Sequence, residues 1–284
     1  MLRIDVVASA GQSRVNEDVV GYQGDAAWVI DGATGVGASL LDAPSDAAWF
    51  AQTASRTLAD VLRESPALPT IEVLREVMAR CGRALAQQQV READGAHELP
   101  SAAFAMVRII DGEAELTTLA DCRIAARDTD GAARLFGASA LDAIEARTIA
   151  AMQAILASEP EIAVDDLKAR LMPGLRENRA RMNTEGGYWI LGVDPAAADH
   201  VWQARLPLAA GRRFALASDG FLRLAELFDV IDAAGLLQIA NEADWTTWLT
   251  RLRELEVRPD CLRHYPRVKL HDDASLLVCE WEGV

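Results

Sequence analysis

The sequence predicts an α+β fold in which two mainly antiparallel sheets are flanked by helix pairs. The elements follow the order strands, two helices, strands, two helices, strands, helices, and a last strand. Short hairpin-type turns join neighbouring strands, which is typical of antiparallel sheets and not of alternating βαβ units. Two sheets with helix pairs packed outside them bury the apolar faces of both pairs. No repeat or Pro/Ser-rich linker interrupts the chain, so we expect a single domain over residues 1–284.

The first third of the chain predicts strands and then a helix pair. Residues 1–7 begin the fold as a strand, and further strands are expected at 19–22 and 26–30. Ser45 is suited to cap a helix whose apolar residues recur at helical spacing. A second helix starts near Thr70, and prolines separate it from the first, so the two helices are expected to be antiparallel.

The rest of the chain alternates groups of strands with groups of helices. Asp111-Gly112 is a two-residue hairpin signal between two of the strands. A helical segment over 140–182, broken around Pro160, follows these strands. The remaining predictions are strands at 103–110, 115–120, 123–127, 188–193, 201–206, 213–217 and 274–281, and helices at about 221–240 and 244–257.

Composition excludes some partners. The net charge is −15, with 43 acidic and 28 basic side chains, and no Lys/Arg block offsets it. Nucleic acid and anionic membrane surfaces are therefore not expected as partners. No apolar run is long enough to span a membrane and no signal peptide is apparent, so a cytoplasmic location is expected. The four cysteines lack metal-ligand spacing and are expected to be reduced thiols.

Two Asp-Gly pairs stand out from the ordinary turn pairs. Asp31-Gly32 and Asp219-Gly220 each come directly after an apolar strand. A glycine at this position lets another group approach the backbone closely, and an unpaired buried carboxylate is costly. Taken alone, each pair fits a structural turn as well as a ligand site.

Three further acidic clusters lie at predicted strand ends: Asn16-Glu17-Asp18, Asp121 and Asp272-Asp273. Neighbouring carboxylates at such ends repel one another unless a cation lies between them. Oxygen ligands suit hard ions such as Mg²⁺ or Mn²⁺. No His/Cys arrangement suggests zinc.

The order of these clusters resembles the successive motifs of the type 2C (PPM) metal-dependent protein phosphatases. The resemblance spans almost the whole chain and implies a four-layer α-β-β-α sandwich with a metal site at one end of the sheets. It also implies that the helical insertion at about 140–184 corresponds to the variable flap of that family. The matching segments are Asn16-Glu17-Asp18, Ile30-Asp31-Gly32, Ala120-Asp121-Cys122-Arg123, Ala217-Ser218-Asp219-Gly220 and Asp272-Asp273-Ala274-Ser275.

The resemblance assigns metal ligands by position. Asp31 is expected to bridge two divalent cations, Mn²⁺ or Mg²⁺, and the carbonyl of Gly32 to bind one of them. Asp219 and Asp272 are expected to complete the ligands of the second ion. Asp121 is expected to help hold a weaker third ion.

The resemblance also assigns residues around the metals. Glu17 and Asp18 are expected to orient metal-bound waters, and Arg14 to bind the phosphate. In the family the phosphate-binding Arg commonly lies four residues before the motif Glu; here that position is Ser13, and Arg14 is three before. Arg14 is expected to act in catalysis together with the metal ligands Asp31 and Asp219.

Several residues depart from the family pattern. Ala33 stands where many members have a general-acid His, and His271 cannot be assigned that role from the sequence. Asp273 replaces the usual Asn and is expected to add negative charge near the metals. Three functions stay open: a phosphatase for phosphoserine or phosphothreonine in a protein or peptide, a phosphomonoesterase for a small molecule, and a catalytically weak module that senses a ligand or binds a partner. The oligomeric state is not predicted.

Overall fold

The computed structural model describes residues 1–139, 141–159, 161–259 and 261–283. The strands are β1 (Leu2–Ala10), β2 (Asp18–Gln23), β3 (Ala26–Gly32), β4 (Ala102–Ile110), β5 (Glu113–Leu119), β6 (Arg123–Arg127), β7 (Ala133–Phe136), β8 (Trp202–Pro207), β9 (Arg212–Ala217) and β10 (Ala274–Trp281). The helices are α1 (Asp46–Glu64), α2 (Thr70–Gln88), α3 (Asp142–Ser158), α4 (Val164–Ala180), α5 (Asp219–Glu226), α6 (Ala233–Leu236), α7 (Glu242–Glu256) and α8 (Cys261–His264), with short 3₁₀ turns η1 (Ala96–Glu98) and η2 (Pro195–His200).

The strands form two five-stranded sheets. One has the order β1-β10-β9-β6-β7 and the other the order β2-β3-β4-β5-β8. Every pair of neighbouring strands is antiparallel. The predicted class, an α+β fold with antiparallel sheets, is therefore confirmed.

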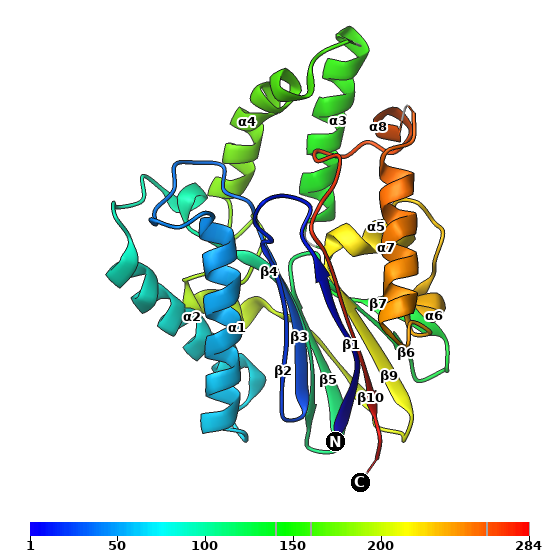
Figure 1. The fold of residues 1–284 in the computed structure, drawn as a ribbon. Helices are drawn as coiled ribbons and strands as arrows, with labels where there is room; N and C mark the ends of the chain where they lie inside the picture. The colour runs from blue at the N-terminus through cyan, green and yellow to red at the C-terminus, as the bar shows by residue number, and fades with distance from the viewer. Residues whose placement is uncertain (140, 160, 260, 284) are drawn as a thin grey trace.

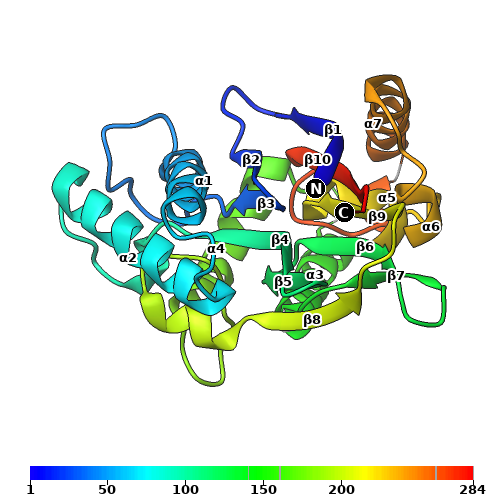
Figure 2. The same cartoon turned by 90° about the horizontal axis from the view of Figure 1, so that it is seen from below.

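Three apolar cores hold four layers together. Val29, Ala105 and Leu216 belong to the core between the two sheets. The helices α1 and α2 cover the outer face of the β3 sheet, and α5, α6 and α7 cover the outer face of the other. Figure 2 shows the two sheets between these helices. The predicted helix–sheet–sheet–helix order is the observed one.

The chain reversals place the acidic clusters at one end of the sandwich. The loop between β1 and β2, the ends of β3, β5 and β9, and the start of β10 all lie there, because neighbouring strands run in opposite directions. The two termini lie together at the opposite end (Figure 1). The helices α3 and α4 rise from the acidic end.

Two predicted elements differ from the structure. Residues 188–193 form no strand and make only two isolated bridges, Met182 with Tyr188 and Ala102 with Leu191. The strand β4 already pairs with β3 and β5 from Phe104 onward, so only the start of β4 is open to Leu191.

The helix expected over 221–240 is interrupted after α5. Asp229 has a positive φ of 50°, and Asp232 then caps α6 by accepting a hydrogen bond from the N–H of Gly235 at 2.7 Å. A left-handed residue cannot continue an α-helix, so the apolar periodicity continues but the helix does not.

The predicted insertion contains α3 and α4, which pack on each other through Met152, Leu167 and Leu171. Ala140, where the insertion was predicted to begin, and Pro160, where a break was predicted, lie outside the described residues. Among the helices of the described chain, none is both long and apolar enough to cross a membrane. The four cysteines are buried free thiols.

Candidate active site

Five carboxylates converge at the acidic end of the sandwich. Asp18 opens β2 and lies directly opposite Asp31, near the end of β3. Asp219 opens α5 immediately after β9, Asp121 follows β5, and Asp272 comes just before β10. Residues paired directly across antiparallel strands have Cα atoms about 4.5–5.5 Å apart, so Asp18 and Asp31 are close neighbours.

Asp31 is repelled by all four of its acidic neighbours. Burial raises its pKa well above the usual range, and repulsion from Asp18, Asp219, Asp121 and Asp272 raises it further. A set of carboxylates that raise one another's pKa in this way is stabilised by cations placed among them.

Asp121 is affected in the same manner. Burial, followed by repulsion from Asp219, raises the pKa of Asp121 to about 8. Both Asp31 and Asp121 keep some exposed surface, so an ion can reach them from solvent.

Asp18 is the most buried of the five, with 5% of its surface exposed. Its Oδ2 accepts a hydrogen bond from the hydroxyl of Ser218 at 2.8 Å. Its Oδ1 is buried and has no partner among the described residues. Burial raises the pKa of Asp18 to about 7 despite the hydrogen bonds from Ser275 and Ser218, which lower it. An unpartnered buried carboxylate oxygen fits a bound water or cation.

The two glycines singled out in the sequence sit where backbones meet. A Cβ on Gly32 would lie 2.6 Å from the carbonyl oxygen of Glu17, to which the N–H of Gly32 donates a hydrogen bond at 3.1 Å. A Cβ on Gly220 would lie 1.9 Å from the carbonyl oxygen of Asp273. Each Asp-Gly pair therefore brings its carboxylate close to another strand end.

Glu17 and Asp273 organise the loop between β1 and β2. The carboxylate of Glu17 accepts hydrogen bonds from the hydroxyls of Thr34 and Ser45. Asp273 accepts one from the N–H of Gln12 and one from the N–H of Glu17, both at 2.7 Å. The extra negative charge expected from Asp273 is thus directed at two backbone donors.

Arg14 lies exposed in the same loop, and no hydrogen bond or ion pair holds it within the described parts of the chain.

A second arginine, which was not predicted from the sequence, approaches from the insertion. Nη2 of Arg179 in α4 donates to the carbonyl oxygen of Ala33 at 2.9 Å, and its Nε is buried with no partner among the described residues. Burial lowers the pKa of this guanidinium. One turn earlier, Nε of Arg176 donates to the carbonyl of Val36 at 2.8 Å.

Asp272 is engaged by two basic side chains. Its Oδ1 lies 2.8 Å from Nζ of Lys269, and its Oδ2 lies 3.0 Å from Nη2 of Arg223. Arg223 was also not predicted, although its position four residues after Asp219 on α5 signals an acidic partner nearby.

Within the described residues, no three His, Cys, Asp or Glu side chains converge on a single point as ligands of one ion.

His271 lies in a network of charged groups that Arg223 connects to Asp272. Its Nδ1 is 2.8 Å from Oε2 of Glu256, a side chain with no exposed surface. Arg223 and Arg253 bind the same carboxylate at 2.6 and 2.8 Å. These partners lower the pKa of Glu256, although burial raises it. The Nδ1 of His271 is therefore engaged by Glu256.

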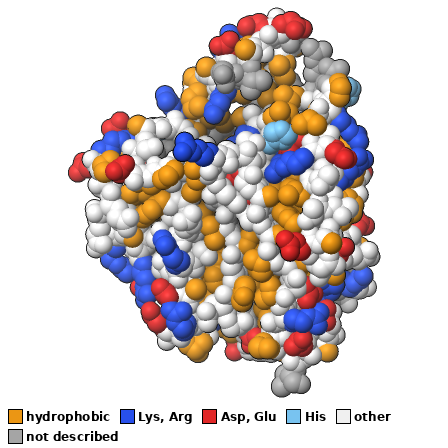
Figure 3. Space-filling view, viewed as in Figure 1, with side chains coloured by type: hydrophobic (Ala, Val, Ile, Leu, Met, Phe, Trp, Pro, Cys, Tyr) orange, Lys and Arg blue, Asp and Glu red, His pale blue; other side chains and the backbone are white. Residues whose placement is uncertain are grey.

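The donor set fits hard cations in its chemistry. All five carboxylates offer oxygen ligands, burial and mutual repulsion raise the pKa values of Asp18, Asp31 and Asp121, and one oxygen of Asp18 has no partner among the described residues. The exception is Asp272, whose two oxygens already face basic groups. Lys and Arg side chains flank the hollow beneath α3 and α4 (Figure 3), which suits an anionic ligand.

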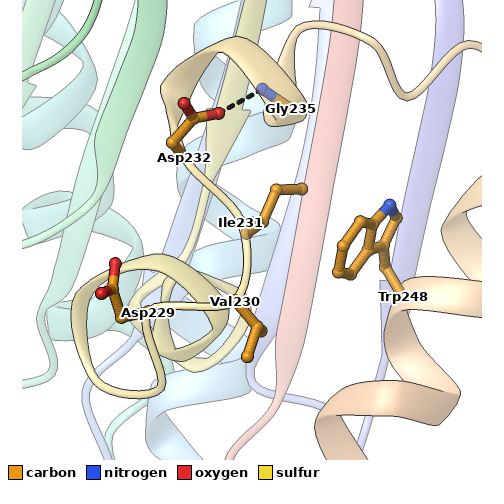
Figure 4. A pocket seen from close by; sticks show the side chains of 6 residues that line it. All are labelled: Asp229, Val230, Ile231, Asp232, Gly235 and Trp248. Atoms are coloured by element: carbon orange, nitrogen blue, oxygen red, sulfur yellow. Dashed lines mark hydrogen bonds between the residues drawn. The ribbon is translucent and has the colours of Figure 1, made fainter.

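A surface depression elsewhere holds none of the predicted site residues. It has a volume of about 360 Å³ and lies beside α6 and α7. Figure 4 shows Ile231 and Trp248 at its wall, with the side chain of Asp232 bound to the N–H of Gly235. Its residues are Asp229, Val230, Ile231, Asp232, Gly235 and Trp248. The convergent carboxylates, rather than this depression, carry groups suited to chemistry.

Fold and site together define a two-sheet α+β protein with an acidic centre at one end of the sandwich. The chain belongs to the protein phosphatase 2C family, whose model matches residues 10–256. A search of curated proteins found no match.

Solved structures share this fold. The serine/threonine phosphatase PstP/Ppp of Mycobacterium tuberculosis superposes with a TM-score of 0.57 at 18% identity, over 99% of both chains. The catalytic domain of PstP in complex with 2 manganese ions superposes with a TM-score of 0.53 at 17% sequence identity, over 98% of this chain and 97% of that chain. The serine/threonine phosphatase Stp1 of Staphylococcus aureus superposes with a TM-score of 0.55 at 8% sequence identity, over 99% of this chain and 95% of that chain. At these identities the likeness concerns the fold alone.

Proposed function

We propose that this protein is a metal-dependent phosphatase that hydrolyses phosphoserine and phosphothreonine in proteins. The observation that carries the proposal is the group of carboxylates around Asp31, whose mutual repulsion would be relieved by bound cations. Membership of the protein phosphatase 2C family supports it. The solved relative PstP, a serine/threonine phosphatase, is described with two manganese ions.

The proposed metal ligands are those that the resemblance assigns. Asp31 and the carbonyl of Gly32 would hold the first Mn²⁺ or Mg²⁺, with Asp31 shared by a second ion that Asp219 and Asp272 complete. Asp121 would take part in a weaker third site. Two such ions, when bound, lower the pKa of a shared water and neutralise the oxygens of a phosphoryl group.

The protein's other residues position the reactants. Asp18, with Oδ1 free, is suited to accept a hydrogen bond from a water, and Glu17 holds the loop that carries Thr34. Arg14, exposed beside the site, is free to pair with a phosphate. We also propose that α3 and α4 act as the flap, since Arg179 ties them to the residue after Gly32.

Ala33 limits the help available to a leaving group, because alanine has no proton to donate. An aryl phosphate needs little such help, whereas the alkoxide of serine or threonine needs more. We therefore expect faster turnover on an aryl phosphate than on a phosphothreonine peptide, with both reactions dependent on Mn²⁺ or Mg²⁺.

The test compares these two substrates side by side, with and without Mn²⁺, in the wild type and two variants. Asp31→Asn and Asp219→Asn should abolish metal-dependent turnover while the far-UV circular dichroism stays unchanged. Asp111→Asn is the matched control, since Asp111 lies in the β4–β5 hairpin, has a φ of 53°, and tolerates asparagine. Normal turnover in both site variants would contradict the proposed site.

The outcome on the two substrates separates the alternatives. Turnover of the aryl ester without any turnover of phosphopeptides would favour a small-molecule phosphomonoesterase. Metal binding without turnover of either would favour a catalytically weak sensor or partner-binding module. Two observations favour that last candidate: Ala33 replaces the family's His, and both oxygens of Asp272 face basic side chains.

A further inference from the structure

Lys269 occupies an unusual position in this chain. Only two of its 28 basic side chains are lysines, Lys168 and Lys269. Nζ of Lys269 lies 2.8 Å from Oδ1 of Asp272 and 3.1 Å from the hydroxyl oxygen of Thr34. Its ammonium therefore sits between the carboxylate before β10 and the loop that follows Gly32, inside the acidic centre.

The two basic partners of Asp272 differ in how firmly they are held. Arg223 is fixed by the fully buried Glu256, whose Oε1 lies 2.6 Å from Nη1. Lys269 lies in the segment between α8 and β10, and 45% of its side chain is exposed. Lysine carries its charge on a flexible four-carbon stem, so Lys269 can leave Asp272 without disturbing the core.

Electrostatics keeps the ammonium charged while it stays there. Burial alone would lower the pKa of Lys269, but attraction to Asp272, and then to Asp219 and Asp31, raises it above its usual value. An ammonium and a divalent cation repel each other, so binding of both at the same carboxylate oxygen is disfavoured.

We propose that the ammonium of Lys269 is a resident cation that competes with a divalent metal ion for Asp272. A metal ion then binds at Asp272 only when Lys269 swings out to solvent, whereas the ligands around Asp31 are open to it directly. The inference rests on the proposed function, because it takes Asp272 as a metal ligand. The inference also implies that the metal position at Asp272 fills only at a higher metal concentration than the position at Asp31.

The test is calorimetric titration of the full chain with Mn²⁺ alone, after treatment with a chelator and desalting. Lys269→Met keeps most of the stem and removes the charge, and Lys269→Arg keeps the charge. Lys168→Met, at the exposed lysine of α4, is the matched control. We expect the weaker Mn²⁺ site to become at least about tenfold tighter in Lys269→Met, a change in binding free energy of about 1.4 kcal/mol. Lys269→Arg and Lys168→Met should bind like the wild type.

The possible results distinguish this inference from the proposed function. Identical isotherms for the wild type and Lys269→Met, with Mn²⁺ bound by both, would overturn the inference and leave the metal site standing. Absence of Mn²⁺ binding in every protein would overturn both.

A second measurement needs no variant. Acetylation of the two lysines of the wild type, followed by mass spectrometry, reports their access to solvent. Lys269 should react faster with Mn²⁺ present than without it, relative to Lys168. An unchanged ratio at saturating Mn²⁺ would contradict the displacement of Lys269.

Discussion

The carboxylate of Asp273 accepts a hydrogen bond from the backbone N–H of Glu17, 2.7 Å away, and its second oxygen accepts one from Gln12 at the same distance. Asp273 is buried, with 8% of its surface exposed. Each of these two backbone donors meets an acceptor oxygen of its own, and aspartate offers two such oxygens where asparagine offers one. This pairing explains why the chain tolerates aspartate where the family usually has asparagine.

Replacing Asp273 should loosen the β1–β2 loop. Asp273→Ala removes two hydrogen bonds to a charged group, and we expect the free energy of unfolding to fall by about 3 kcal/mol. Asp273→Asn should lower the free energy of unfolding by about half as much, because asparagine keeps one acceptor oxygen and removes the repulsion between residue 273 and Asp18. Urea unfolding of the three proteins measures both changes. Equal stability of Asp273→Asn and Asp273→Ala would contradict the account.

The close approach at Gly220 predicts a severe effect of the smallest side chain. A Cβ there would meet the carbonyl of Asp273 at 1.9 Å, so Gly220→Ala should lower the free energy of unfolding by about 3 kcal/mol. Gly174→Ala is the matched control, because nothing lies within 4 Å of a Cβ in that part of α4. Alanine is a better helix former than glycine, so the free energy of unfolding of this control should rise by up to about 1 kcal/mol. Similar shifts in the two melting temperatures would refute the prediction.

Arg179 should matter for function more than for stability. Its guanidinium is buried, and its Nε has no partner among the residues described, so Arg179→Met should leave the free energy of unfolding unchanged or raise it by about 1 kcal/mol. Turnover of an aryl phosphate should nevertheless fall about tenfold, because the carbonyl of Ala33 loses its anchor. Arg176→Met, which frees Val36 farther along the loop, should have a smaller effect on turnover. A loss of stability in Arg179→Met without loss of turnover would contradict this.

The raised pKa values of Asp18 and Asp121 predict an unusual pH dependence for the metal-free protein. Their folded pKa values are about 7 and about 8, whereas unfolded aspartate has a pKa near 3.8. Between these values the folded state binds more protons than the unfolded state, so stability falls as pH rises from about 4 to about 8. Each such proton contributes a slope of about 1.4 kcal/mol per pH unit.

Thermal unfolding of the protein in chelator, between pH 5.5 and 8.5, measures this effect. The melting temperature should fall with rising pH in chelator and depend less on pH with saturating Mn²⁺, because the bound ions favour the ionised carboxylates. Asp121→Asn should flatten the metal-free profile. A melting temperature that rises with pH in chelator would disprove the prediction.

The position of the carboxylates followed from local patterns. Asp31 and Asp219 each come after an apolar strand, and antiparallel strands that alternate in direction return their ends to the same edge of a sheet. Asp18, Asp121 and Asp272 also flank strands, and the resemblance to the type 2C phosphatases implied that the site lies at one end of the sandwich. The helix and strand order was readable for the same reason, since periodicity is a local property.

The predictions that differ from the structure failed because they depend on contacts between residues that are distant in the sequence. The strand expected at 188–193 is apolar enough, but the neighbouring edge of β4 is already paired, which no local pattern records. Asp229, which follows the end of α5, has a left-handed backbone conformation, so the helix does not resume there although the apolar periodicity continues.

The sequence by itself determined the fold class and the set of acidic strand ends, because both depend on residues close together in the chain. Tertiary structure alone decided which basic groups face those carboxylates. Arg179 meets Ala33 across 146 positions, and Lys269 meets Thr34 across 235. Such pairings depend on how whole layers pack and on where long, flexible side chains find a partner, and neither leaves a periodic signal in the sequence.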